Sequence, residues 1–174
     1  LDTVQFMAPE NVSGHFEIQV QAKTIDTDPD DPGATDTAIS GSATLANLVV
    51  LPVADQVTLA VSSPSRGLED SEIALKIKPT SSDPSETFRV TLSGIPDGAV
   101  LKYGGGEQTV TGGEVTIDDF DSNESLTIQP PLNSNEDFTL KASAVSVDTL
   151  DGYTDVSASS ETLDINVVVK GVPD

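Results

Sequence analysis

The 174-residue sequence contains no cysteine and no tryptophan, and it has a single histidine. Without cysteine the chain can form no disulfide, no thiolate metal site and no cysteine nucleophile. A hydrolytic triad needs a base beside its nucleophile, and His15 is the one histidine available. Aromatic residues make up only 4% of the chain, too few to line the cleft of a glycosidase. These absences predict that the protein is not an enzyme.

Basic residues are also scarce, because 8 Lys and Arg stand against 29 Asp and Glu, for a net charge of −21. A surface this negative repels nucleic-acid phosphates and anionic lipid head groups, so we expect no nucleic-acid partner. No run of 18 apolar residues is present, so we expect no membrane insertion. The hydrophobic fraction of 36% is nevertheless sufficient for a packed core, and the negative surface attracts cations.

Apolar residues alternate with polar ones over several short segments, including 73–77, 88–92, 138–144 and 163–169. A period of two is typical of strands with one buried face. Clusters of Gly, Pro, Asp and Ser separate the segments, and the glycines at 104–106 indicate a hairpin turn. No segment has a sustained helical period. The pattern predicts an all-β fold, an antiparallel Ig-like β-sandwich of Greek-key type.

Part of the sequence recurs 122 residues later (138 − 16 = 122). The clearest pairs are Phe16 with Phe138, Ile18 with Leu140, Ala22 with Ala144 and Asp26 with Asp148, and after a gap Asp36 matches Asp155. We interpret residues 57–174 as a complete repeat and residues 1–55 as the last three strands of a preceding one. Asn47 falls where the second copy has Ile165, and a β-bulge there would move Leu48 inward.

The partial repeat has an apolar face built from Phe6, Phe16, Ile18 and Val20. Three strands cannot bury such a face by themselves. Upstream residues, another chain or the complete repeat would have to cover it, and the sequence leaves these three alternatives open.

The segments GLEDSEIAL (67–75), SETFRVTLSGIPDGA (85–99) and LTIQPP (126–131) resemble the tandem Ig-like or cadherin-like repeats of large bacterial RTX adhesins. The resemblance covers essentially the whole chain. It implies a calcium-rigidified sandwich in a secreted protein of the bacterial cell surface, where it serves cell adhesion or biofilm attachment. Its partners would be the neighbouring repeats of the same polypeptide.

Acidic loops are the candidate cation sites, because Ca²⁺ takes 6–8 oxygen ligands. If the first strand of the complete repeat starts near Val57 and successive strands alternate in direction, several loops meet beside the linker residue Asp55. We call this end of the repeat the junction pole. The carboxylates predicted there as Ca²⁺ ligands are Asp55, Asp83, Glu86, Asp118, Asp119, Asp121, Asp148, Asp151 and Asp155.

Two further groups complete the predicted Ca²⁺ ligands. Glu69 and Asp70 lie at the opposite pole, and Asp26, Asp28, Asp30 and Asp36 lie in the partial repeat. The spacing of Asp26, Asp28 and Asp30 imitates the start of an EF-hand loop, but that loop's glycine and its bidentate glutamate are both missing. Any site there would be irregular. The competing interpretation is that these aspartates only satisfy the backbone of their own turns.

Ligand binding is the alternative function. A Ca²⁺ ion with an open coordination position could capture a peptide carboxylate or a glycan of a host surface. The loops at 26–37 and 148–158 are long enough to frame such a pocket, and Tyr153 is a candidate contact residue.

Overall fold

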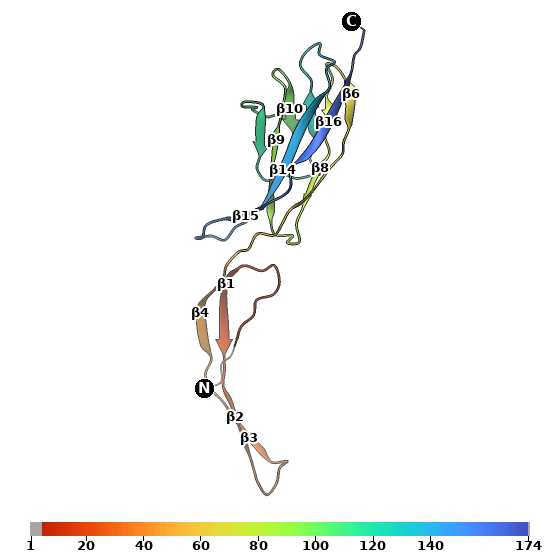
Figure 1. Cartoon of the computed structure of the whole chain (residues 1–174). Helices are drawn as coiled ribbons and strands as arrows, with labels where there is room; N and C mark the ends of the chain where they lie inside the picture. Colours follow the sequence, from red (N-terminus) through yellow and green to blue (C-terminus); the bar gives the residue numbers. More distant parts are fainter. Residues whose placement is uncertain (1–4, 174) are drawn as a thin grey trace. The chain divides into compact units, whose positions relative to one another are not determined.

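The computed structural model describes residues 5–173, and all regular structure in this range is β-strand (Figure 1). The predicted all-β class is therefore confirmed, and the strand pairs are antiparallel with one exception. In the described range no helix exists that could cross a membrane. The chain divides into two units, Leu1–Pro52 and Val53–Asp174, called unit 1 and unit 2 below.

Unit 2 contains two larger sheets and one two-stranded pair. The first sheet has the order β11-β10-β13-β7, and the second has the order β12-β9-β14-β16-β6, with β15 pairing to β14. Strand β5 pairs with β8. The strands are β5 (Thr58–Val61), β6 (Ser65–Leu68), β7 (Ile73–Ala74), β8 (Ile77–Thr80), β9 (Thr87–Ser93), β10 (Val100–Tyr103), β11 (Gly106–Glu107), β12 (Glu114–Ile117), β13 (Leu126–Gln129), β14 (Phe138–Asp148), β15 (Val156–Ser159) and β16 (Leu163–Lys170).

Both larger sheets of unit 2 contribute to one hydrophobic core. Ile73 and Ile128 come from the first sheet, and Val90, Leu140 and Ile165 come from the second, each at most 1% exposed. In β14 and β16 every second residue is buried, as the period of two predicts. The alternation therefore fixes which face of each strand is turned inward.

One pair of strands is parallel, which the expectation of a purely antiparallel fold did not include. After β5 pairs with β8, the chain continues as β6, which lies parallel to β16 with Ser65 opposite Val167. Gly67 of β6 approaches the core closely, because a Cβ at this position would overlap with the side chain of Ile73. The first extended segment of unit 2 is thus divided into two strands, of which β5 pairs with β8 and β6 pairs with β16.

Four strands in two pairs form within the described residues of unit 1, 5–52. Strand β1 (Gly14–Val20) pairs with β4 (Ala43–Val50), and β2 (Lys23–Thr27) pairs with β3 (Thr35–Ile39). Phe16 lies opposite Leu48 but Ile18 lies opposite Leu45, so β4 carries one extra residue. Asn47, within this stretch, has a φ of 66°. The predicted bulge is therefore present, and Leu48 is half-buried.

The internal repeat is visible in the hydrogen bonds of both units. In unit 1 the amide of Ala22 donates to Oγ of Ser40 at 2.9 Å, and the amide of Ser40 donates to the carbonyl of Ala22 at 2.8 Å. In unit 2, Ala144 and Ser160 make the same two bonds at 2.9 and 2.8 Å. Strands β1 to β4 therefore follow the same plan as β14, β15 and β16.

Candidate functional site

Two acidic side chains extend the inward rows of unit 2 at the junction pole. Ser146 and Asp148 continue the buried row of β14, and Glu86 stands two residues before Phe88, which packs against the core from β9. Phe88 lies opposite Ser146, and the pairing of the two strands ends at Thr87 and Val147, next to Glu86 and Asp148 in the chain. Glu86 and Asp148 are each 7% exposed. The core therefore ends in buried carboxylates.

The linker residue Asp55 is tied to this group by two hydrogen bonds, and a third joins it to Ser82. Its amide donates to Oε1 of Glu86 at 2.6 Å, and its carbonyl accepts from Oγ of Ser146 at 2.7 Å. Its carboxylate accepts from Oγ of Ser82 at 2.7 Å. Strand tracing placed Asp55 close to Glu86, and the structure confirms that proximity. The entry of the chain into unit 2 is thus held by the same side chains that end the core.

One buried oxygen of this group has no partner. Oε2 of Glu86 is fully enclosed and accepts no hydrogen bond. The carboxylate of Asp148 makes no hydrogen bond or ion pair within the described residues either, but its oxygens are not fully enclosed, in contrast to Oε2 of Glu86. A buried carboxylate without a partner costs several kcal/mol, as an order of magnitude. Among the described residues, Oε2 of Glu86 is the buried side-chain oxygen for which no hydrogen-bond partner is present.

The nearby Asp83 differs, because its side chain accepts hydrogen bonds from its own loop. It is 5% exposed, and its Oδ1 accepts hydrogen bonds from the amide and the hydroxyl of Ser85 at 2.7 and 2.6 Å. This is the turn-stabilising role common for aspartate. Asp83 shapes the loop that carries Glu86.

Asp119 and Asp121 lie close to Glu86 as well. The three residues line a depression of about 260 Å³ together with Phe88 and Phe120. Oδ1 of Asp121 accepts from the amide and side chain of Asn123 at 2.9 and 2.8 Å. Asp118, in contrast, forms an exposed ion pair with Arg89, which neutralises it. In their present rotamers no three acidic or histidine side chains among residues 5–173 converge on a point that could hold a metal.

The remaining predicted ligands do not join this group. Asp151 and Asp155 are exposed in the loop between β14 and β15. At the opposite pole, Glu69 accepts from the amide of Val172, and Oδ1 of Asp70 accepts from the amide of Asn133 at 2.8 Å. These two carboxylates fasten the end of β16 and the loop after β13.

In unit 1, Asp26 and Asp36 face each other across β2 and β3, which are exposed throughout. Oδ1 of Asp28 accepts from the amide of Asp30 at 2.8 Å. Like charges placed opposite each other destabilise a strand pair. The hairpin thus brings Asp26 and Asp36 together, while Asp28 orders the turn.

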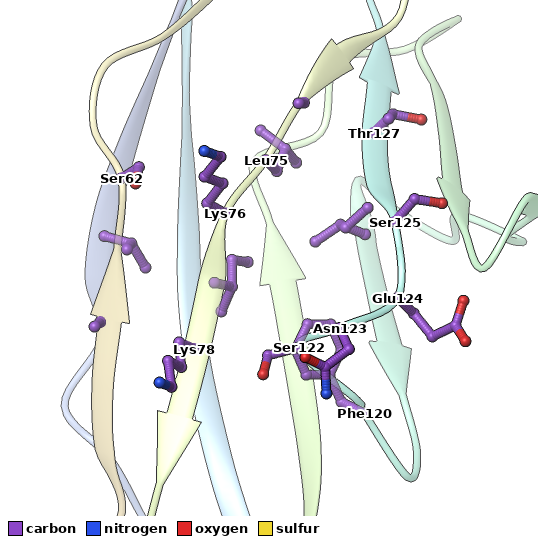
Figure 2. Close-up of a pocket in the computed structure, with 15 residues that line it drawn as sticks. Ser62, Leu75, Lys76, Lys78, Phe120, Ser122, Asn123, Glu124, Ser125 and Thr127 are labelled. Carbon is purple, nitrogen blue, oxygen red and sulfur yellow. The ribbon is translucent and has the colours of Figure 1, made fainter.

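Sequence reasoning missed a groove on the first sheet of unit 2. It has a volume of about 560 Å³ and lies between β8 and the segment 122–127, with Phe120 among its lining residues (Figure 2). The amide of Leu75 donates to the carbonyl of Leu126, and beyond this bond the two segments diverge. Lys76 and Lys78 stand on the β8 side. No local pattern could reveal this groove, because it results from the pairing of distant strands.

On the exposed face of the first sheet, Glu72 pairs with Lys102 at 2.7 Å and accepts from Oγ1 of Thr127 at 3.1 Å. The hydrogen bond from Lys102 is the main reason that the pKa of Glu72 is lowered, and the same bond raises the pKa of Lys102. The pair links β10 to the segment before β7.

A scan against known protein families gave no match for this chain, and a search of curated protein sequences gave none either.

Proposed function

We propose that the chain is a calcium-stabilised, Ig-like module of a secreted bacterial surface adhesin, and that it extends the adhesin rather than catalysing a reaction. The observation that carries this proposal is the buried, unpartnered Oε2 of Glu86, a side chain whose other carboxylate oxygen accepts from the amide of the linker residue Asp55. Asp148, also buried, ends the inner row of the neighbouring strand β14. A cation at this position would both neutralise the end of the core and fix the linker.

The sandwich architecture is part of the same proposal. Two sheets that share one core, with β14 between β9 and β16, are consistent with an Ig-like arrangement. The division of the first extended segment into β5 and β6, which have different partner strands, also agrees with an Ig-like arrangement. In such a module the linker enters at one pole and the chain leaves at the other, so repeats can follow one another in line.

Glu86, Asp148 and Asp55 are the residues that would hold the ion. Hard carboxylate oxygens are the ligands that Ca²⁺ prefers, and backbone carbonyls and water would complete its shell. The ion would supply charge neutralisation alone. Without it, Oε2 of Glu86 remains buried without a partner, so we expect the bond between Oε1 of Glu86 and the Asp55 amide to open more readily.

Thermal unfolding with Ca²⁺ and with EGTA tests this proposal. Extracellular calcium modules bind with dissociation constants of about 10⁻⁴–10⁻³ M. At about 10 mM Ca²⁺ such a site would stabilise the folded chain by about 1.4–2.7 kcal/mol. Glu86→Gln and Asp148→Asn should lose most of this increase, and Glu161→Gln, at an exposed position, should keep it. An identical melting temperature in Ca²⁺ and EGTA would contradict the calcium site.

A second candidate function is ligand binding, as a module that recognises a peptide carboxylate or a glycan of a host surface. The groove beside β8 favours it, because Lys76 and Lys78 flank an apolar lining and Ser125 and Thr127 add hydroxyl groups. A peptide and glycan array probed with and without Ca²⁺ tests this role. A saturable signal that Lys78→Glu abolishes would support it, and an array without signal would exclude the ligand classes on it.

A further inference from the structure

The described part of unit 1, residues 5–52, has the strands of a half-repeat but not the sheet that covers them in unit 2. Phe6, Val20 and Leu45 are 46, 46 and 60% exposed. By the sequence offset Phe6 and Val20 correspond to Ile128 and Ala142. The strand pairing matches Leu45, opposite Ile18, with Ile165, opposite Leu140, in place of the sequence match between Asn47 and Ile165. All three counterparts are fully buried in unit 2. Phe6 already contacts Phe16, with ring centroids 5.9 Å apart. The inner face of unit 1 is therefore formed but uncovered by any described strand of unit 1.

One edge of unit 1 is open as well. In unit 2, residues 141–147 of β14 pair with β9. The equivalent residues of unit 1 are 19–25, and no described strand pairs with them on that side, since β1 pairs only with β4 and β2 only with β3. An open edge beside an apolar face is the arrangement to which an extended peptide adds as a strand.

We propose that this edge of unit 1 is a docking site for an antiparallel strand with the alternating pattern of β9. The repeat identifies the occupant, because unit 2 fills the same place with Phe88, Val90 and Leu92 on the inner face. Transferred to unit 1, Val90 of the incoming strand would lie opposite Ala22, and Leu92 opposite Val20. The partner is thus a strand of this repeat type.

The register also predicts which charge the docked strand should carry at one position. In unit 2, Arg89 lies opposite Val145, whose counterpart in unit 1 is Lys23. A strand with arginine at this position would face a like charge, whereas one with glutamate would form a cross-strand ion pair. The docking site therefore prefers an acidic residue opposite Lys23.

A second copy of the same face is a poorer occupant. Residues 1–55 carry nine acidic side chains and one basic side chain. Joining two such faces would bring two strongly negative surfaces together, which charge repulsion opposes.

The test titrates two labelled synthetic peptides into the full 174-residue chain. One has the sequence of residues 85–95, and the other is identical except for Arg89→Glu. We expect saturable binding of both, slowed hydrogen exchange at 19–25, and tighter binding of the glutamate peptide. In the chain variant Lys23→Glu the preference should move about 1.5- to 5-fold toward the arginine peptide, the range of cross-strand ion pairs.

Two controls separate this site from other surfaces. Val20→Asp should weaken both peptides at least tenfold, whereas Ser157→Asp, at an exposed position of β15 in unit 2, should leave binding unchanged. Because a free peptide can bind weakly, a chain with the peptide tethered to its N-terminus by a flexible linker is examined by hydrogen exchange in parallel. No protection at 19–25 in the tethered chain would overturn the proposal, and so would a stable dimer of the peptide-free chain.

Discussion

Alanine substitution at equivalent positions of the two units should lower the free energy of unfolding by very different amounts. Leu140 is fully buried between the sheets of unit 2, and its counterpart Ile18 is half-buried on the uncovered face of unit 1. Each substitution removes three carbon atoms, a transfer term of about 2.4 kcal/mol when the side chain is completely buried. In Leu140→Ala the cavity term is added, so the expected loss is about 2–5 kcal/mol. In Ile18→Ala about half of the transfer term remains and no cavity forms, so the loss should be about 1 kcal/mol.

Urea unfolding followed by tyrosine fluorescence and circular dichroism measures this difference. Both tyrosines, Tyr103 and Tyr153, belong to unit 2, and Tyr103 stacks on Phe120 with ring centroids 5.2 Å apart. The tyrosine signal therefore reports on unit 2. Leu140→Ala should shift its midpoint strongly, and Ile18→Ala should leave it unchanged and alter only the dichroism. An equal loss for both variants would refute the reasoning, because it would mean that the face of unit 1 is covered.

Two further changes test individual contacts. Ser146→Ala removes the buried hydroxyl that donates to the carbonyl of Asp55, so it should destabilise unit 2 by about 1–3 kcal/mol in urea unfolding and speed hydrogen exchange around Asp55; unchanged exchange there would contradict a clamping role. Lys102→Met removes the main hydrogen bond that lowers the pKa of Glu72, so the NMR-measured pKa of Glu72 should rise toward its ordinary value of 4.5. A lowered carboxyl pKa contributes stability above the unfolded-state value that is lost as the pH falls through the folded-state value, so wild type should exceed the variant in stability at neutral pH and lose this advantage in acid; a Glu72 pKa unmoved by the substitution would exclude the ion pair.

The sequence predicted those features that depend on local pattern. The alternation in 138–144 and 163–169 predicted which residues of β14 and β16 are buried. The glycines at 104 and 105 both have positive φ, 58° and 80°, as a two-residue hairpin turn requires. Asn47 marked the bulge because the repeat offered a second copy for comparison.

Features that depend on strand pairing could not be predicted. Pro64 and Gly67 give residues 64–67 the composition of a turn, yet Ser65–Leu68 forms β6, which lies parallel to the distant strand β16. The groove beside β8 arises where two paired segments diverge. For the candidate site, tracing strand directions brought Asp55 near Glu86, but it could not show that Asp83 is satisfied by Ser85 while Glu86 is left with a buried free oxygen.

In both units a serine side chain and backbone hold the two strands of a hairpin together, Ser40 with Ala22 in unit 1 and Ser160 with Ala144 in unit 2. We call this pair of hydrogen bonds the serine bridge, and the loop at the end of the hairpin its tip. Beyond the bridge, both units close the hairpin with seven residues, 28–34 in unit 1 and 149–155 in unit 2, and the two loops have different sequences. The bridge holds the strands together at a point that does not involve those residues. A series of such repeats would therefore be able to vary the tip from one copy to the next while keeping a constant length per module.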